Sequence, residues 1–219
     1  MDTQKVRDRT PDELLARKKE FLKICDILDE LNINYFLQTG VLLGAVRDKD
    51  FIKWDWGVDI SVFTNEFIQQ INSVVLALKK SNFEIIYSLC EKDDLKIYFK
   101  GKYSKEVTGY TIFAWNYSKD RDIYWRRNYS VPSKFLKNFS NIDFLGRKFN
   151  CPENPEEYLE YAYGDWRRPI RTSDKDLYNS NEYYKTKKIF ILKKIKNILK
   201  KIFKYYFLKY LFFYFYITS

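Results

Sequence analysis

The sequence predicts an α/β domain of the α+β kind, with a mixed sheet flanked by helices. An amphipathic helical pattern over 11–31 is followed by two strand-like runs between 35 and 62 and by a second helical pattern over 64–82. Short runs rich in Ile, Tyr, Phe and Trp then follow, separated by charged turns. A βαβ-type beginning followed by several strands is typical of this fold class.

The first helix has a well-defined start. Thr10 is an N-cap residue, Pro11 stands at the first helical position, and Glu13 completes a capping box. The apolar face at helical spacing consists of Leu14, Phe21, Cys25, Leu28 and Leu31. The helix is therefore expected to pack this face against the core.

A glycine turn follows the first helix. Residues 35–39 have the length and composition of a short buried strand, which Gly40 ends. Residues 41–47 are expected to form one or two helical turns, in which Gly44 permits close approach of another backbone segment. Backbone N–H groups at such a turn can hold phosphate oxygens.

An acidic strand is predicted over 55–62. Asp55, Gly57 and Asp59 recur at period two and therefore share one face of that strand. Carboxylates beside a phosphate-holding turn can bind Mg²⁺, which uses one or two carboxylates together with waters and substrate phosphates. A surface hairpin with solvated acids would show the same spacing, so spacing alone leaves both interpretations open.

Capping and turn residues predict where the remaining strands and helices begin and end. Thr64 can cap the second helix, which reaches Asn82, and the apolar face of that helix consists of Phe67, Ile71, Val74, Val75 and Leu78. Strand-like runs lie near 83–89, 95–101, 109–116 and 122–127. A hairpin with Gly146 at its turn then precedes a helix with Pro155 near its first position and Gly164 at its end.

The composition excludes several kinds of catalytic centre. Histidine is absent, which removes Ser-His and Cys-His dyads, histidine general bases and histidine-ligated zinc. Cys25, Cys90 and Cys151 are far apart and lack C-x-x-C spacing, so neither a disulfide framework nor a zinc site is indicated. The expected compartment is reducing, and residues 1–9 are too polar to open a signal peptide.

The net charge of +10 is concentrated at the C-terminal end of the sequence. Ten lysines and no acidic residue follow Glu182, so residues 1–182 are neutral overall. A neutral body makes nucleic acid an unlikely partner. The sequence predicts three parts: a domain over 1–172, a polar linker over 173–186 and a basic, aromatic amphipathic helix over 187–219.

The segment 187–219 has the pattern of an interfacial membrane binder. Isoleucines share one helical face and lysines another, with aromatic residues between them. Its longest lysine-free apolar run, 210–217, is far shorter than the roughly 20 residues that span a bilayer. An anionic membrane surface is the expected partner. A helix packed on the body, or a disordered lysine-rich end, would explain the same pattern.

Two regions of the sequence resemble the LicD/fukutin family of nucleotidyltransferase-fold proteins. The first half of the family's core motif, G-[ST]-L-L-G-A-x-R, is matched by Gly40, Leu42, Leu43, Gly44, Ala45 and Arg47. The second half, W-D-x-D-x-D, is matched at Trp54, Asp55, Val58 and Asp59. Residues 130–170 resemble the family's closing signature, a strand with "vP" followed by "peeyLe…YGdW…P". The resemblance covers residues 10–172.

The resemblance implies a nucleotidyltransferase-like fold and a phosphotransfer reaction. Family members move a phospho-alcohol, such as phosphocholine or ribitol phosphate, from a nucleotide-activated donor to a hydroxyl of a glycan or lipid-linked sugar. Mg²⁺ or Mn²⁺ is the implied cofactor, because a metal-bridged diphosphate and an in-line acceptor hydroxyl are the main requirements of such chemistry.

The resemblance also assigns roles to residues of this sequence. Gly40 and Gly44 would shape the phosphate-binding loop, with Val41 between them. Arg47 would contact phosphate or fix the acidic strand. The catalytic and metal-binding carboxylates would be those of Asp55 and Asp59.

Simpler explanations exist for two sets of neighbouring residues. Arg47 could pair with Asp48 or Asp50 at the surface. Trp54 and Trp56 alternate with the acids and would point to the opposite face of the strand, where packing is favoured over stacking on the donor.

Three positions depart from the family pattern where the chemistry is expected. Val41 replaces a phosphate-facing hydroxyl, Gly57 replaces the middle carboxylate, and Thr111 stands where a further strand acid would lie. On one straight strand Asp55 and Asp59 would be roughly 13 Å apart, too far to share one Mg²⁺ unless the strand bends sharply at Gly57. A working transferase with a reduced metal site and a catalytically degenerate binding protein at the membrane are both open.

The expected location follows from the implied acceptor. In bacteria such acceptors are commonly lipid-linked sugars on the cytoplasmic leaflet. The protein is therefore expected in the cytoplasm, peripheral to the inner leaflet of the cytoplasmic membrane, with 187–219 as its anchor.

Overall fold

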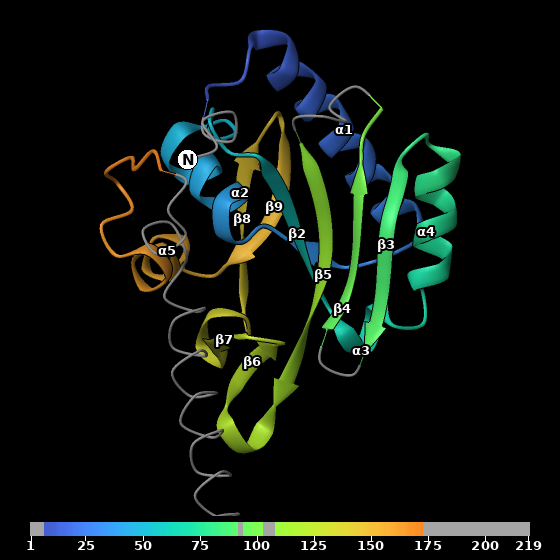
Figure 1. Ribbon diagram of the computed structural model, residues 1–219. Coiled ribbons are helices and arrows are strands. Elements are labelled where there is room, and N and C mark those ends of the chain that lie inside the picture. Colours follow the sequence, from blue (N-terminus) through green and yellow to red (C-terminus); the bar gives the residue numbers. More distant parts are fainter. Residues whose placement is uncertain (1–6, 92–93, 103–107, 173–219) are drawn as a thin grey trace, which may run out of the picture.

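Figure 1 shows a computed structural model of the chain, which describes residues 7–91, 94–102 and 108–172. Within these ranges no helix combines the length and the apolar character needed to cross a membrane. The linker and the amphipathic helix predicted over 173–186 and 187–219 lie outside the described residues, so both stay predictions.

Helices and strands alternate in the first half of the described chain, whereas the second half consists mainly of strands. The first half contains α1 (Pro11–Glu30), β1 (Tyr35–Phe36), α2 (Thr39–Leu43), a π-helical turn (Gly44–Asp48), β2 (Gly57–Phe63), α3 (Thr64–Phe67) and α4 (Ile71–Lys80). The second half contains β3 (Glu84–Glu91), β4 (Asp94–Lys100), β5 (Gly109–Ser118), β6 (Ile123–Arg126), β7 (Tyr129–Pro132), β8 (Phe139–Phe144), β9 (Arg147–Pro152) and α5 (Pro155–Tyr163).

One mixed sheet forms the centre of the fold. Five strands lie in the order β1-β2-β5-β4-β3, and the hairpin of β6 and β7 continues from β5. β2 and β5 pair in parallel, whereas the other pairs in this sheet are antiparallel. β8 and β9 form a separate hairpin. The predicted mixed sheet with flanking helices is confirmed.

The two faces of the sheet have different surroundings. α1 and α4 cover one face, where Val58 and Ile60 of β2 are fully buried (Figure 1). Tyr110 of β5 faces the same side, since its hydroxyl donates a hydrogen bond to the Glu20 carboxylate of α1 at 2.9 Å. Side chains alternate along a strand, so Asp59 points to the opposite face.

Three of the turns and helix ends predicted from local signals are confirmed. The Thr10 hydroxyl accepts the Glu13 N–H at 3.3 Å, and the Glu13 carboxylate accepts the Thr10 N–H at 2.7 Å, which completes the capping box of α1. α5 ends before Gly164, whose φ is 71°. Leu145 and Gly146, both with positive φ, connect β8 to β9.

Two predicted elements differ from the structure. The helix expected over 64–82 is divided into α3, which packs on β2 and β5, and α4, which packs on α1 and β3. Phe63, and not Thr64, occupies the N-cap position of α3, and the Thr64 hydroxyl has no hydrogen-bond partner among the described residues. The strand expected over 35–39 shortens to β1. The Leu37 N–H donates to the Asn150 carbonyl oxygen of β9 at 2.8 Å, and Thr39, with a left-handed φ of 53°, begins α2.

The acidic strand begins two residues later than predicted, at Gly57. The Asp55 N–H donates to the Ile52 carbonyl oxygen at 3.1 Å, and the Asp55 carboxylate accepts the Gly57 N–H at 3.2 Å, so the chain turns here. A side chain that binds a backbone N–H two residues on competes with strand formation. Asp55 therefore lies outside β2, and the spacing of a straight strand does not apply to Asp55 and Asp59.

Gly44 brings two backbone segments into contact. A Cβ atom at this position would lie 2.5 Å from the Asp50 carbonyl oxygen and 3.2 Å from the Ile52 nitrogen. Backbone atoms cannot move aside as a flexible side chain can, so the position requires glycine. The predicted close approach at Gly44 is confirmed.

Candidate active site

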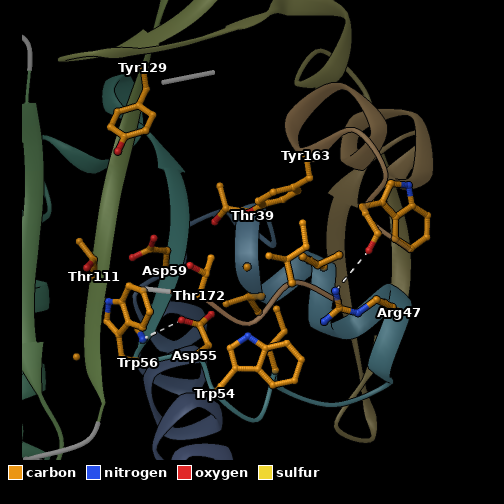
Figure 2. Close-up of a pocket in the computed structure, with 18 of the residues that line it drawn as sticks. Thr39, Arg47, Trp54, Asp55, Trp56, Asp59, Thr111, Tyr129, Tyr163 and Thr172 are labelled. Atoms are coloured by element: carbon orange, nitrogen blue, oxygen red, sulfur yellow. Dashed lines mark hydrogen bonds between the residues drawn. The ribbon is translucent and has the colours of Figure 1, made fainter. Parts of the chain in front are cut away.

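A cavity of about 580 Å³ lies on the face of the sheet opposite α1 (Figure 2). One wall comes from the sheet and includes Asp59, Thr111, Arg126 and Tyr129. Facing residues come from α2, from the end of α5 and from the segment that follows it, among them Thr39, Tyr163, Asp165, Trp166, Arg168 and Thr172. The volume is in the range of sites for small ligands.

The cavity collects most of the site residues predicted from the sequence. Its lining includes Gly40, Val41, Arg47, Asp55 and Asp59, together with the departing positions Gly57 and Thr111. Gly44 is not among the lining residues, and its contact with the backbone at Asp50 gives it a packing role.

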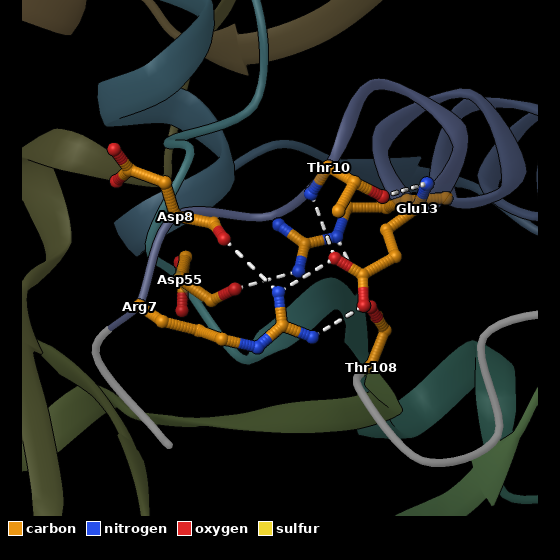
Figure 3. A network of polar contacts seen from close by, with 7 residues as sticks. Arg7, Asp8, Thr10, Glu13, Asp55 and Thr108 are labelled. Atoms are coloured by element: carbon orange, nitrogen blue, oxygen red, sulfur yellow. Dashed lines mark hydrogen bonds and ion pairs between the residues drawn. The ribbon is translucent and has the colours of Figure 1, made fainter. Parts of the chain in front are cut away.

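Arg17 and Gly40 position Asp55. The Arg17 side chain is fully buried and donates to the carbonyl oxygen of Asp55 at 2.6 Å, to that of Ile52 at 3.4 Å and to the Thr108 hydroxyl at 3.1 Å. Figure 3 shows Asp55 and Thr108 in this network. A Cβ atom at Gly40 would lie 2.8 Å from a carboxylate oxygen of Asp55, so the glycine makes room for the acid. Burial raises the pKa of Asp55, and the charge of Arg17 opposes that shift.

Asp59 projects from β2 beside Thr111 of β5. The two residues are register partners, and the Thr111 side chain makes a hydrogen bond to the Asp59 carboxylate. Burial raises the pKa of Asp59, while the charges of Arg126 and Lys96 and the Thr111 hydrogen bond oppose the shift. The Asp59 charge also raises the pKa of Asp55, so the two carboxylates are close enough to repel each other.

The predicted orientation of Trp54 and Trp56 is wrong, although Trp54 also packs against the hydrophobic core, as expected. Both side chains line the cavity together with Asp55 (Figure 2), instead of packing on an opposite face. Alternation between faces requires an extended strand, whereas the chain turns at Asp55 before β2 begins. Both indoles therefore contribute aromatic surface to the cavity.

Arg47 forms an ion pair with Asp48, which is one of the two surface pairs that the sequence allowed. Its guanidinium donates to the Asp48 carboxylate at 2.8 and 2.9 Å. A further N–H donates to the Trp166 carbonyl oxygen at 3.4 Å, which ties the glycine turn to the segment after α5. Asp50 pairs with Lys18 instead, at 2.6 Å. Arg47 thus lies at the cavity while its guanidinium is held by protein groups.

Two groups of lining residues were not predicted from the sequence. Arg126 and Tyr129 belong to the hairpin of β6 and β7, and no local spacing indicates that this hairpin reaches the cavity of Asp59. The second group follows the start of the closing signature and consists of Tyr163, Asp165 and Trp166. The closing signature could have identified these three residues as part of the site, because all three belong to it and line the cavity.

Thr39 combines an uncommon backbone conformation with an unpartnered hydroxyl. Its φ of 53° is in the left-handed region, which β-branched residues rarely adopt. The hydroxyl is buried and has no hydrogen-bond partner among the described residues, and Figure 2 shows it next to Tyr163. Backbone strain of this kind clusters at ligand sites. Thr39 therefore supplies a hydroxyl to the cavity two residues before Val41, the position at which the family pattern has one.

The carboxylates available to a metal ion are few. Across the described ranges, no three His, Cys, Asp or Glu side chains gather closely enough to hold an ion between them. Asp55 and Asp59 nevertheless face one cavity, and Mg²⁺ often takes one or two carboxylates, with water and substrate phosphate completing its shell. Burial deprives both acids of solvation that a cation would replace, so the pair fits this minimal arrangement.

The family comparison gives the class of protein, a nucleotidyltransferase domain. Residues 32–154 match the family model described as "LicD/FKTN/FKRP, nucleotidyltransferase domain". This match spans more than half of the sequence. The chain belongs to the LicD/FKTN/FKRP family, and both the resemblance and the nucleotidyltransferase-like fold predicted from the sequence are confirmed.

Several curated proteins are similar to the chain. The ribitol 5-phosphate transferase FKRP of Homo sapiens is 23% identical over 160 residues, which cover 69% of this chain and 32% of that protein. The ribitol-5-phosphate transferase FKTN of Mus musculus is 25% identical over 181 residues, covering 78% and 38%. An uncharacterized protein of Rickettsia prowazekii (strain Madrid E) is 28% identical over 144 residues, covering 64% and 51%. The chain thus matches only 32% to 38% of the length of the two transferases.

Solved structures of one antibiotic-resistance factor are also similar. The solution structure of ANT(2'')-Ia gives a TM-score of 0.47 at 13% identity and covers 87% of this chain and 92% of that chain. The crystal structure of ANT(2'')-Ia in complex with adenylyl-2''-tobramycin gives a TM-score of 0.46 at 13% identity and covers 82% and 92%.

Proposed function

We propose that this chain transfers a phospho-alcohol, of the phosphocholine or polyol-phosphate kind, from a nucleotide-activated donor to a hydroxyl of a cell-surface glycan or lipid-linked sugar. The observation that carries the proposal is the meeting of Asp55, from the turn before β2, and Asp59, from β2, in one cavity that also contains arginine and aromatic side chains. Family membership and the similarity to two proteins named as ribitol-phosphate transferases support the same class of reaction.

In the proposed reaction, the acceptor hydroxyl attacks the phosphorus atom that bears the alcohol. A new P–O bond forms in line with the P–O bond to the nucleotide, which breaks, and a nucleoside monophosphate leaves. The hydroxyl proton passes to a carboxylate of the Asp55–Asp59 pair. In the metal-free site, burial raises the pKa of both acids.

Other lining residues suit a nucleotide-activated donor. Arg168 adds positive charge toward the diphosphate, and the Thr39 hydroxyl can donate a hydrogen bond to a phosphate oxygen. The indoles of Trp54 and Trp56 offer flat surfaces on which a nucleobase can stack. These groups bind and orient the donor while the acids serve the transfer.

Donor binding and transfer by the purified chain test this function. Isothermal titration with CDP-choline and CDP-ribitol, with and without Mg²⁺, measures binding, and release of CMP in the presence of soluble and lipid-linked glycosides measures transfer. Metal-dependent binding and CMP release are expected. Binding that ignores the metal, with no CMP released from either donor, would contradict the transferase function and favour the degenerate binding protein.

Mg²⁺ or Mn²⁺ is the proposed cofactor, held by Asp55 and Asp59 with water and donor phosphate. When bound there, the ion neutralises charge on the diphosphate. The chain's own residues determine how tightly the site holds it, and that affinity can be measured without any substrate.

Gly57→Asp is expected to tighten Mn²⁺ binding by about tenfold or more, because a third carboxylate joins the site. The position lines the cavity, and a Cβ there would have the Gly109 carbonyl oxygen as its nearest neighbour at 3.9 Å, so a side chain fits. Titration of Mn²⁺ into the substrate-free protein measures the change, with Gly57→Ala as the matched control. Equal Mn²⁺ affinities of the two variants would contradict a metal site at this place.

We also propose that 187–219 holds the domain at the anionic inner leaflet of the cytoplasmic membrane, beside a lipid-linked acceptor. The support is the basic, aromatic pattern of that segment. A chain lacking 187–219 is expected to lose co-sedimentation with phosphatidylglycerol vesicles, while neither form binds phosphatidylcholine vesicles tightly. Undiminished sedimentation of the shortened chain would refute the anchor.

A further inference from the structure

The guanidinium of Arg126 is stacked between aromatic rings at the cavity wall. Its Cζ lies 3.6 Å from the centroid of the Phe113 ring of β5 and 4.2 Å from that of the Tyr129 ring of β7, with the Trp115 ring at 5.1 Å. Stacking on ring faces fixes a planar guanidinium in one orientation. The Arg126 charge is therefore held at a defined place.

That place is next to the acid on the sheet wall. Phe113 follows Thr111 by two residues, so both side chains face the same side of β5. Arg126, Thr111 and Asp59 all line the cavity, and the charge of Arg126 opposes the rise that burial causes in the pKa of Asp59. The guanidinium thus lies within electrostatic reach of the carboxylate without leaving its aromatic neighbours.

The sheet wall of the cavity has fewer negative charges than a site that binds phosphate through metal ions alone would need. Neither Gly57 nor Thr111 carries a negative charge, so Asp59 is the acid that β2 and β5 contribute to the cavity lining. A bound diphosphate needs positive partners, and a pair of acids can recruit only limited metal charge. Arginine keeps its charge at any physiological pH and binds phosphate through two parallel N–H···O bonds.

We propose that Arg126 is a donor-binding residue whose guanidinium contacts the diphosphate, so that part of the donor affinity is independent of any divalent metal. The identity of the donor rests on the proposed function. The stacking rings orient the guanidinium fork. A lysine at this position would keep the charge and lose the fork.

The test titrates the full chain and its R126Q and R126K variants with CDP, cytidine and inorganic pyrophosphate, in EDTA and again in Mg²⁺. The wild type is expected to bind CDP and pyrophosphate in EDTA. R126Q should weaken both by about 10- to 100-fold while cytidine binding is unchanged, and R126K should weaken them less. The matched control is R121Q, because Arg121 is exposed, lies 5.8 Å from the Trp125 ring, and is not among the cavity-lining residues.

Three results would overturn the inference. The first is equal affinity of R126Q and the wild type for CDP and pyrophosphate, and the second is a wild type that binds neither CDP nor pyrophosphate in EDTA. The third is a parallel loss of cytidine and CDP binding in R126Q and R126K, which would indicate a packing role for Arg126. The proposed function can fail separately. CMP release with unchanged R126Q affinities would reject this inference alone, whereas Arg126-dependent CDP binding without CMP release would reject the transferase alone.

Discussion

Asp59→Asn is expected to lower phospho-alcohol transfer by at least about 10²-fold while the chain stays folded. Asparagine has nearly the shape of aspartate and can still accept the Thr111 hydrogen bond, but it brings no charge to a metal ion and takes no proton. CMP release measures the loss. Asp120→Asn is the matched control, because Asp120 is exposed and is not among the cavity-lining residues. Equal activity of the two variants would contradict the role of Asp59.

The same variant is expected to be more stable than the wild type at pH 7. Burial raises the pKa of Asp59 in the folded chain above the ordinary value of 3.8, which applies to the unfolded chain. At a pH between the unfolded-state pKa and the folded-state pKa, the folded chain therefore binds more protons than the unfolded chain. The unfolding free energy of the wild type therefore falls as the pH rises through that interval and stays lowered above it. Asparagine does not titrate, so the advantage of the variant should grow from acid to neutral pH.

Urea unfolding between pH 4 and pH 8, in EDTA so that no metal contributes, measures this difference. Asp120→Asn should follow the wild-type profile. A gap between Asp59→Asn and the wild type that stays constant with pH, or that narrows toward neutral pH, would show that the folded protein does not hold Asp59 at a raised pKa.

Arg17→Met is expected to lower the unfolding free energy by roughly 3 kcal/mol or more. Arg17 is 0% exposed and donates to the carbonyl oxygens of Ile52 and Asp55 and to the Thr108 hydroxyl. Methionine fills a similar volume but leaves these buried acceptors without donors. Because the same bonds hold the turn at Asp55, donor binding should weaken together with stability.

The midpoint of urea unfolding measures the effect of Arg17→Met, with Arg167→Met as its control. Arg167 is exposed and pairs with Glu156 at the surface, so its replacement should change stability by less than about 1 kcal/mol. Similar losses in the two variants would mean that the buried bonds of Arg17 contribute little.

The features that the sequence predicted correctly depend on residues within a few positions of one another. The capping box at Thr10, the hairpin turn at Gly146 and the end of α5 at Gly164 are local signals, and all three are confirmed. The close approach at Gly44 and the family motif around Asp59 were also available from short spacings.

The predictions that failed depended on how far a regular element continues. The strand assumed through Asp55 gave way to a turn, because the Asp55 carboxylate binds the Gly57 N–H. With that turn, Trp54 and Trp56 came to the cavity and not to the opposite face. One side-chain hydrogen bond was therefore enough to invalidate a pattern that was correct from Gly57 onward.

The parts of the site that the sequence could not indicate depend on pairing between distant strands. Arg126 reaches the cavity because β5 continues into the hairpin of β6 and β7, and its neighbours Phe113 and Tyr129 lie on two different strands. No window of residues contains this cluster. Its position follows from the sheet order, which a single sequence does not specify.

Tryptophan placement gives the protein a built-in optical reporter. Of the five tryptophans in the chain, Trp54, Trp56 and Trp166 line the cavity, whereas Trp115 is 1% exposed. Indole emission responds to the polarity around the ring, so a molecule that enters the cavity is expected to change the emission of the indoles that line it. Occupancy can thus be followed in the unmodified protein by its own ultraviolet fluorescence, with no label attached.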